Sequence, residues 1–271
     1  MNRKILVITD LDASLLQEDY SYEEAKPIIE KLKKLGFPIV LNSSKTLSEL
    51  EAIAHEMGST APIIAENGGA VCIHCESSLT PPPGAIKKRN YFITNAGLSR
   101  SNVLEKVHTL RSSQQYNFQG FADWTEKELA EQTNLDYASA IQAKDRHVTE
   151  PILWYDTAER LKTFLAELSE DNIIALRGGK FIHLMGKIDK ADGAKIVTEL
   201  YKDQEPDVEW TVVALGDSEN DLNMLEQADI PVVIPHKGDI RIRPKNPNTN
   251  YAIHEATQGW ADTLDKILTR F

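Results

Sequence analysis

The sequence predicts an α/β protein in which a parallel-sheet core carries a second, inserted α/β unit. Three continuous apolar runs stop abruptly at polar residues, which is typical of strands buried on both faces of a parallel sheet. These runs cover residues 5–8, 37–41 and 211–215. Between residues 89 and 186 the chain is less hydrophobic and mixes helical and strand patterns. We therefore expect residues 1–88 and 187–271 to form the core and residues 89–186 to form the inserted unit.

The composition argues against several classes of protein. Of the 271 residues, 41% are hydrophobic and 26% are charged, as is usual for a globular protein with a buried core. A net charge of −11 argues against a nucleic-acid partner, although a local group of cations or a metal can still attract a small anionic substrate. No apolar run approaches the ~20 residues of a membrane span, and the N-terminus shows no cleavable signal pattern. We expect a cytoplasmic protein with no membrane partner.

The first apolar run ends at two carboxylates separated by a single leucine. Asp10 and Asp12 fall at or just past the carboxyl end of this strand, where open α/β sheets bind ligands. Two carboxylates this close repel each other unless a cation lies between them or one is protonated. The pair suggests a metal site or an acid and nucleophile pair, although two aspartates could also simply cap a turn.

A helical pattern and a second strand follow. Residues 27–35 have helical spacing, and the strand 37–41 ends in Asn42-Ser43-Ser44-Lys45. Thr46 and Glu49 then have the capping-box spacing of a helix start. The second strand therefore also ends in polar side chains, although Ser43 and Thr46 could serve only to cap the helix.

A third strand is predicted at residues 62–65, followed by Glu66-Asn67-Gly68-Gly69 and by a possible returning strand at 70–74. The only two cysteines, Cys72 and Cys75, lie in this region. No second Cys/His pair completes a tetrahedral zinc site, and alternate residues of a strand face opposite sides. We expect these cysteines to pack in the structure and to have no metal or redox role.

Residues 77–88 contain three consecutive prolines and a glycine without periodicity, which predicts a linker. Helical and strand patterns follow in the inserted unit. The helices are expected near 102–110, 125–132 and 157–168, and the strands near 151–155, 173–176 and 181–185.

The core pattern returns with a helix that begins at Lys190. The apolar strand 211–215 then ends in Gly216-Asp217-Ser218-Glu219-Asn220-Asp221. A short helix at 222–227 and a last strand at 230–234 complete the predicted core. Lys190 could be one more solvated lysine, and Asp217 and Asp221 could be a capped helix start.

The polar residues at these strand ends should converge, because the carboxyl ends of parallel strands meet at one edge of a sheet. Carboxylates would come from Asp10, Asp12, Asp217 and Asp221, and a hydroxyl and an ammonium from Ser43 and Lys45. Carboxylates suit a divalent cation, and a hydroxyl with an ammonium suits a phosphate.

With these motifs in order, the sequence resembles the haloacid dehalogenase superfamily of phosphatases. The matching pieces are Asp10-x-Asp12-x-Ser14, Ser43 after a hydrophobic strand, Lys190, and Gly216-Asp217-x-x-Asn220-Asp221. The resemblance implies a Rossmann-like parallel-sheet core with an inserted α/β cap domain. Ala13 and Ser14 stand where the family's usual pattern is Gly-Thr, and Asp192 is an acidic departure after Lys190.

A narrower resemblance is to the mannosyl-3-phosphoglycerate phosphatases. It rests on four segments, two of which lie in the inserted unit. They are Ser43-Ser44-Lys45-Thr46, Ala65-Glu66-Asn67-Gly68, residues 150–154 (EPILW) and residues 177–186 (RGGKFIHLMG). The resemblance implies a cytoplasmic, Mg²⁺-dependent phosphatase that hydrolyses 2-O-mannosyl-3-phosphoglycerate to phosphate and mannosylglycerate, a compatible solute.

The resemblance also implies a role for each motif residue. Asp10 would be the nucleophile that forms an aspartyl-phosphate, and Asp12 would be the general acid and base. Mg²⁺ would be held by the carboxylates of Asp10 and Asp217 and by the backbone carbonyl of Asp12. Ser43 and Lys190 would bind the transferring phosphoryl group. Asp221 and Asn220 would support the metal ligands without binding the ion.

Substrate contacts in the inserted unit are expected from cations, a histidine and backbone amides that suit a glycerate carboxylate. The candidates are Arg146, Arg177, Gly178, Gly179, Lys180 and His183. His183 could equally be a satisfied histidine on a strand, and the cations could form an ordinary solvated face.

Three other functions remain open on the sequence. The same chemistry could act on glucosyl-3-phosphoglycerate or another sugar phosphate. A phosphomannomutase-type isomerase would share the core and the cap, and a non-catalytic sugar-phosphate sensor is suggested by Ala13. The pattern leaves the oligomeric state open.

Overall fold

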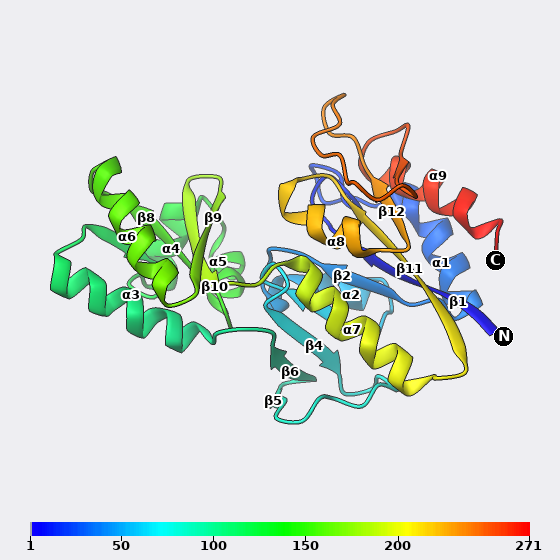
Figure 1. Ribbon diagram of the computed structural model, residues 1–271, viewed down its shortest axis with the longest axis horizontal. Helices are drawn as coiled ribbons and strands as arrows, with labels where there is room; N and C mark the ends of the chain where they lie inside the picture. The colour runs from blue at the N-terminus through cyan, green and yellow to red at the C-terminus, as the bar shows by residue number, and fades with distance from the viewer. Residues whose placement is uncertain (1) are drawn as a thin grey trace.

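The computed structural model describes residues 2–271 and contains two sheets with helices packed on both faces of each (Figure 1). The larger sheet has nine strands in the order β13-β12-β11-β1-β2-β3-β4-β6-β5. The smaller sheet has four strands in the order β7-β8-β10-β9. None of the helices in this described range is long and apolar enough to cross a lipid bilayer.

The larger sheet is parallel from β13 to β3 and antiparallel at its other edge. Its parallel strands are β1 (Asn2–Thr9), β2 (Ile39–Asn42), β3 (Ile63–Ala65), β11 (Val208–Gly216), β12 (Ile230–Val233) and β13 (Asn250–Tyr251). The antiparallel strands are β4 (Ala70–His74), β5 (Ile86–Lys88) and β6 (Tyr91–Asn95). The predicted parallel-sheet core is therefore confirmed.

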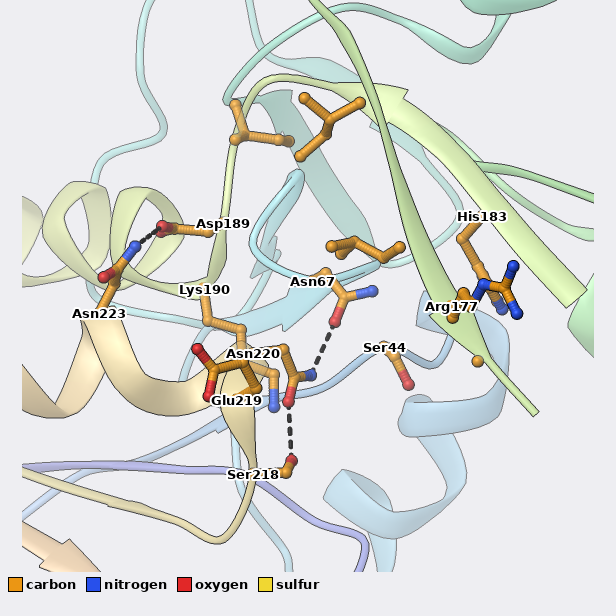
Figure 2. Close-up of a pocket in the computed structure, with 14 residues that line it drawn as sticks. Ser44, Asn67, Arg177, His183, Asp189, Lys190, Ser218, Glu219, Asn220 and Asn223 are labelled. Atoms are coloured by element: carbon orange, nitrogen blue, oxygen red, sulfur yellow. Dashed lines mark hydrogen bonds between the residues drawn. The ribbon is translucent and has the colours of Figure 1, made fainter. Parts of the chain in front are cut away.

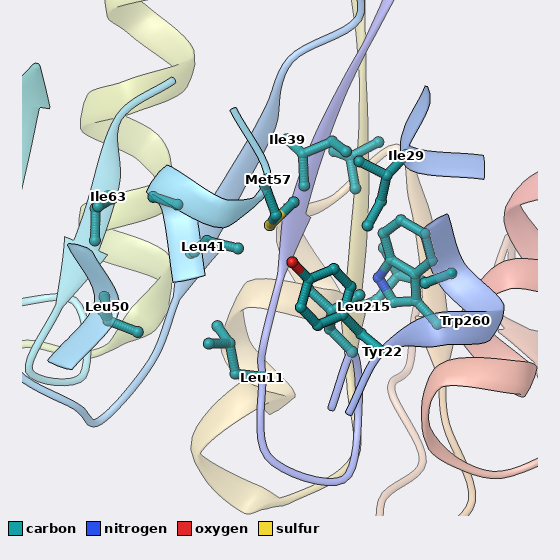
Figure 3. Close-up of a cluster of buried hydrophobic side chains, with 14 of the residues drawn as sticks. Leu11, Tyr22, Ile29, Ile39, Leu41, Leu50, Met57, Ile63, Leu215 and Trp260 are labelled. Carbon is teal, nitrogen blue, oxygen red and sulfur yellow. The ribbon is translucent and has the colours of Figure 1, made fainter. Parts of the chain in front are cut away.

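Alternate residues of β1 explain how the larger sheet is covered. Ile5 and Val7 belong to a buried cluster with α1 (Lys26–Leu35), α2 (Leu47–Glu56) and α9 (Ala256–Leu268). Leu6 and Ile8 face α7 (Lys190–Gln204) and α8 (Leu222–Gln227) on the opposite side. Figure 3 shows the first cluster, in which the indole of Trp260 lies beside Tyr22 and Ile29. Two short 3₁₀ helices, η1 (Glu23–Ala25) and η2 (Glu219–Asp221), complete this part of the chain.

The smaller sheet is antiparallel throughout. Its strands are β7 (Phe118–Gly120), β8 (Glu150–Trp154), β9 (Ile173–Gly178) and β10 (Phe181–Gly186). Its helices are α3 (Arg100–Gln114), α4 (Glu126–Thr133), α5 (Tyr137–Lys144) and α6 (Ala158–Glu170). Helices α3 and α6 bury one face against a cluster that includes Ile152 and Leu184, whereas α4 and α5 pack on the other face near Leu153 and Phe181.

The chain passes between the two sheets at different places than the sequence suggested. The stretch 77–88, expected to be a linker, contains the edge strand β5, and β6 also pairs within the larger sheet. The chain leaves the larger sheet at 96–99, after β6, and returns at 187–189, before α7. Three consecutive prolines suggested a linker because they break periodicity, yet here they precede a short edge strand. We use "smaller unit" below for residues 96–188.

Candidate functional site

Asp10 lies directly after β1, and its backbone is held from two sides. Its amide donates to the carbonyl of Leu215 at 2.9 Å, which ties it to β11. The indole of the fully buried Trp260 donates to Thr9 Oγ1 at 3.0 Å, and the Thr9 hydroxyl donates to the Asp10 carbonyl at 2.7 Å. The packed core therefore sets the position of this carboxylate at the end of the strand.

Lys190 joins Asp10 to Asp221. Its ammonium lies 2.5 Å from Asp10 Oδ1 and 2.5 Å from Asp221 Oδ1, and the residue is only 1% exposed. Burial alone would lower the pKa of this lysine, but the charges of the two carboxylates outweigh burial and raise it. Lys190 is thus a fixed positive charge inside the carboxylate cluster, and the alternative of a solvated lysine is wrong.

The α7 N-terminus is locked in place by its own residues and by a neighbouring strand. Asp189 caps the helix by accepting from the amides of Ala191 and Asp192. Asn42, at the end of β2, donates to the carbonyl of Lys190 at 3.0 Å. These contacts explain why a helix can begin with a buried lysine that points at the first strand.

Three carboxylates form a group with the chemistry of a divalent-cation site. One oxygen from each of Asp10, Asp217 and Asp221 lies within 4.8 Å of the others. Burial raises the pKa of Asp10 to about 7 despite the charge of Lys190, and burial with the charge of Asp221 also raises the pKa of Asp217. Three buried carboxylate oxygens this close to one another are the hard ligands that a divalent cation prefers. The residues therefore fit Mg²⁺.

The three carboxylates are not equivalent. Asp221 uses both oxygens internally, because Oδ1 accepts from Lys190 while Oδ2 accepts from the amides of Asp217 and Ser218 at 3.0 and 3.1 Å. Asp10 and Asp217 make fewer such contacts and are the better candidates for binding an ion directly. This difference agrees with the supporting role expected for Asp221.

Two basic residues that the sequence analysis did not single out contact Asp217. Arg241 Nη1 lies 3.2 Å from Asp217 Oδ2, and His236 Nδ1 lies 4.0 Å from the same oxygen. Both residues come from the irregular segment after β12, where no periodic pattern marks a position as inward-facing. Only their charge could have drawn attention to them.

Asp12 and Ser43 lie at the same edge of the sheet but outside the carboxylate group. The Asp12 side chain is 51% exposed and pairs with Lys45 Nζ at 2.5 Å, and Lys45 also lies over the ring of Tyr20. Ser43 is buried, donating its amide to the Ile64 carbonyl at 3.0 Å. The predicted convergence of strand ends is thus observed, and Lys45 reaches the second aspartate of the motif.

The loop after β3 reaches both the Asp217 segment and α7. Asn220 Nδ2 donates to Asn67 Oδ1 at 3.1 Å, and Ser218 Oγ donates to Asn220 Oδ1 at 2.8 Å (Figure 2). Gly68 has φ +93°, and a Cβ there would lie 1.8 Å from the carbonyl oxygen of Asp189. Only glycine allows the α7 start to approach this closely.

A cavity of about 630 Å³ opens beside Lys190, between the two units. Residues of the core, including Asn67 and Asn220, line one side of it, and Arg177 and His183 of the smaller unit line the other (Figure 2). Both of the latter come from the β9–β10 hairpin. The cavity is large enough for a sugar phosphate, and it is lined by one cation from each unit, Lys190 and Arg177.

Of the six substrate-contact candidates in the smaller unit, three line this cavity: Arg177, Gly178 and His183. A Cβ on Gly178 would lie 2.7 Å from His183 Nε2, so glycine lets the imidazole lie against β9. Burial lowers the pKa of His183 to about 4, helped by the charge of Arg146, so the ring is neutral near pH 7. It can take part in hydrogen bonds but adds no charge.

The other three candidates make contacts elsewhere in the smaller unit. Arg146 donates to Thr149 Oγ1 at 2.8 Å and lies over the ring of Phe121. Lys180 lies over the ring of Phe181, and Gly179 has φ +58° in the β9–β10 turn. None of these three lines the cavity in this structure.

A family model described as haloacid dehalogenase-like hydrolase matches residues 7–237, which include every strand end described above. The chain belongs to this family. Asp10, Lys190 and the Asp217 segment all lie within the matched residues.

Curated relatives match this hydrolase over most of its length. A glucosyl-3-phosphoglycerate/mannosyl-3-phosphoglycerate phosphatase from Persephonella marina is 33% identical over 97% of each chain. A protein with the same name from Methanococcoides burtonii is 31% identical over 85% of each chain. A mannosyl-3-phosphoglycerate phosphatase from Pyrococcus furiosus is 32% identical over 87% of this chain and 92% of its own.

Solved structures share the whole fold at low sequence identity. A Thermoplasma acidophilum protein aligns with a TM-score of 0.67 at 15% identity over 99% of both chains. The sucrose-phosphatase of Synechocystis aligns with a TM-score of 0.58 at 11% identity over 98% of both chains. The inserted α/β arrangement is therefore shared across distant sequences.

Proposed function

We propose that this hydrolase is a Mg²⁺-dependent phosphatase that releases phosphate from 2-O-mannosyl-3-phosphoglycerate to give mannosylglycerate. The observation that carries the proposal is similarity over 97% of the chain to a phosphatase named for glucosyl- and mannosyl-3-phosphoglycerate. That similarity extends through the smaller unit, whose hairpin lines the cavity. Because two relatives are named for both sugars, the glucosyl compound is the second candidate substrate.

In the proposed reaction Asp10 attacks the phosphorus of the ester. A bond forms between an Asp10 carboxylate oxygen and phosphorus while the bond from phosphorus to the glycerate oxygen breaks, which leaves an aspartyl-phosphate. Lys190, 2.5 Å from Asp10 Oδ1, would neutralise charge on the phosphoryl group, as would the Ser43 hydroxyl. Mg²⁺ held by Asp10, Asp217 and the backbone carbonyl of Asp12 would add positive charge at the same place.

Asp12 would act as the general acid and then as the general base. It gives a proton to the departing glycerate oxygen and then takes one from the water that attacks the aspartyl-phosphate, so that phosphate leaves and both aspartates are restored. In this structure Asp12 is paired with Lys45 at 2.5 Å. That ion pair must open before the carboxylate can face the leaving oxygen.

The smaller unit would act as a cap over residues 2–95 and 189–271. Arg177 would bind the glycerate carboxylate, and His183 and the amides near Gly178 would contact the neutral part of the substrate. We place the reaction in the cytoplasm, because the phosphorylated substrate is charged and because Cys72 and Cys75 are both free thiols, as is usual in a reducing compartment.

A phosphate-release assay with a panel of substrates tests this proposal. We expect release from mannosyl- and glucosyl-3-phosphoglycerate in the presence of Mg²⁺, loss of activity with a chelator, and much slower release from mannose 6-phosphate and sucrose 6-phosphate. Comparable rates on all four esters would contradict the substrate assignment. Conversion of mannose 1-phosphate to mannose 6-phosphate without net phosphate release would favour the mutase, and no turnover of any ester would favour a sensor.

A further inference from the structure

Glu66 is a buried carboxylate that the proposed reaction does not use. It follows β3 in the loop Glu66-Asn67-Gly68-Gly69, is 0% exposed, and adopts φ 54°. A non-glycine residue in this backbone region costs about 1 kcal/mol or more and persists only where its surroundings hold it. An ionisable side chain at such a position calls for a specific partner.

All hydrogen-bond donors to its carboxylate come from the smaller unit. Glu66 Oε1 accepts from the amide of His147 at 2.6 Å. Oε2 accepts from the amides of Val148 and Thr149 at 3.2 and 2.8 Å and from Thr149 Oγ1 at 2.5 Å. Burial would raise the pKa of Glu66, but these hydrogen bonds and the charge of Arg146 lower it to about 2. A residue of the core thus inserts an ionised carboxylate into the segment that connects α5 to β8.

The rest of this loop contacts the catalytic half of the molecule. Asn67 accepts from Asn220, and Gly68 packs against the α7 start that carries Lys190. Gly69 is enclosed on the other side, since a Cβ there would lie 2.4 Å from Val148. Four consecutive residues therefore contact both the smaller unit and the segment next to the carboxylate cluster.

A charged contact that also joins the two units is more exposed. Asp145 accepts from Lys88 at 2.6 Å and from Ser48 at 2.7 Å. In the ion pair the Asp145 side chain is 25% exposed and the Lys88 side chain is 39% exposed. Exposed ion pairs contribute little to a fixed geometry. Glu66 is a buried charged contact, and its four donors give it a more defined orientation than this ion pair has.

We propose that Glu66 is a positioning residue that fixes the smaller unit at the distance from Lys190 at which the cavity fits a glycosyl-phosphoglycerate. The substrate part of this inference rests on the proposed function, whereas the positioning part does not. With the carboxylate bound to residues 147–149, the β9–β10 hairpin lines the cavity that Lys190 also lines. Loss of the carboxylate leaves the two units joined by the segments 96–99 and 187–189, by the apolar contact of Val148 with the core and by more exposed contacts.

Glu150 provides a matched control. Its carboxylate is also buried, but its partners Arg100 and Ala122 both lie in the smaller unit, at 2.6 and 2.8 Å. Glu150→Gln therefore neutralises a buried carboxylate without touching the contact between units. A general effect of losing a buried charge would appear in both variants.

Distances between spin labels on the two units test the positioning role directly. Labels at Lys162→Cys on α6 and Lys202→Cys on α7, both exposed positions, would be introduced with Cys75→Ser to remove the exposed thiol. We expect a narrow distribution of label-to-label distances in the parent. In Glu66→Gln we expect a clearly broader distribution that extends to longer distances. Glu150→Gln should match the parent. Equal distributions in all three proteins would overturn the proposal.

Thr149→Val keeps the test decisive if Glu66→Gln does not fold. It removes the hydroxyl that donates to Glu66 and accepts from Arg146, but it keeps the backbone donors, so we expect a smaller change of the distribution in the same direction. A parent-like distribution in Thr149→Val, with Glu66→Gln unfolded or parent-like, would overturn the positioning role.

Kinetics test the consequence for substrate. Glu66→Gln should raise KM for mannosyl-3-phosphoglycerate about tenfold, while kcat/KM for p-nitrophenyl phosphate, which needs little of the cap, changes about twofold or less. Equal losses on both substrates would contradict a role in substrate fit. If the parent does not turn over the glycosyl ester, the proposed function fails, and the spin-label distances still decide the positioning role.

Discussion

Ala13 has the backbone conformation that most favours glycine. It lies at φ 61°, one residue after Asp12. The phosphatases that this sequence resembles usually have glycine at this position. A Cβ in this left-handed region costs about 1–2 kcal/mol, and part of that is offset because alanine restricts the unfolded chain more than glycine does. The sequence pattern identified the departure, and the structure shows that the strain is real at this position.

We expect Ala13→Gly to stabilise the protein by about 1 kcal/mol, because it relieves this strain. The free energy of unfolding in urea is the measurement. Ala166→Gly, on the exposed surface of α6, is the control and should destabilise by about 1 kcal/mol, since glycine weakens a helix interior. Destabilisation of equal size by both changes would show that Ala13 is not strained.

Arg177 should determine substrate preference if it binds the glycerate carboxylate. Arg177→Ala would remove a charge-assisted contact worth about 1.5–3 kcal/mol and lower kcat/KM for mannosyl-3-phosphoglycerate roughly ten- to a hundred-fold. An aryl phosphate lacks the carboxylate and should be hydrolysed almost as before. Lys180→Ala is the control, because Lys180 carries the same charge on the same hairpin but does not line the cavity.

The ratio of the two kcat/KM values is therefore the quantity to compare between parent and variants. Equal losses of both activities in Arg177→Ala would mean that this arginine supports the hairpin or touches the phosphate. A change of ratio in Lys180→Ala as large as in Arg177→Ala would indicate a diffuse effect of charge.

Residue positions were predictable where a continuous apolar strand ends in a polar side chain. Asp10 and Asp217 were found in this way, and the resemblance added Lys190. Arg241 and Glu66 were not assigned a role, because their contacts join segments far apart in the chain. No local sequence pattern indicates which distant carboxylate or amide a side chain contacts in the folded protein.

At the scale of elements, the loop after β3 has a property that pH can test. Glu66 has a pKa of about 2 in the folded protein against an ordinary value of 4.5. A lowered folded pKa contributes stability above pH 4.5 that is lost as the pH falls toward 2. From pH 6 to pH 3 this loss amounts to about 2 kcal/mol, since each pH unit below 4.5 costs ~1.4 kcal/mol.

We expect the parent to lose about 2 kcal/mol more unfolding free energy between pH 6 and pH 3 than Glu66→Gln, which cannot titrate. Urea unfolding at a series of pH values measures both curves. Parallel curves for the two proteins would mean that the Glu66 carboxylate is not held in its ionised form by residues 147–149.

Elements with strong periodicity were mostly predicted, whereas several short strands and one long helix were missed. The strands β1, β2 and β11 and the helix α6 stand out as apolar runs or as one-sided helical patterns. The short strands β5, β6 and β7 were not predicted, because tertiary pairing stabilises them more than local preference does. The helix α9 was also missed, although Trp260, Leu264 and Ile267 have helical spacing and are buried.

At the scale of the whole molecule, two units share one cavity. The carboxylate cluster and Lys190 belong to the core, and Arg177 and His183 belong to the smaller unit. The core would then carry out the chemistry and the smaller unit would select the substrate. The contact between the two units would couple these two roles. The sequence indicated both units but placed the first crossing too early, because the strands β5 and β6 of the larger sheet lie at or after the end of a proline-rich stretch.

The central claim is that Asp10 carries the phosphoryl group during hydrolysis of a glycosyl-phosphoglycerate. Asp10→Asn keeps the shape of the side chain but cannot act as the nucleophile. Phosphate release from mannosyl-3-phosphoglycerate with Mg²⁺ should therefore fall by at least about a thousand-fold in this variant. Circular dichroism should show an unchanged fold. Phosphate release by folded Asp10→Asn at a rate comparable to that of the parent would contradict the account.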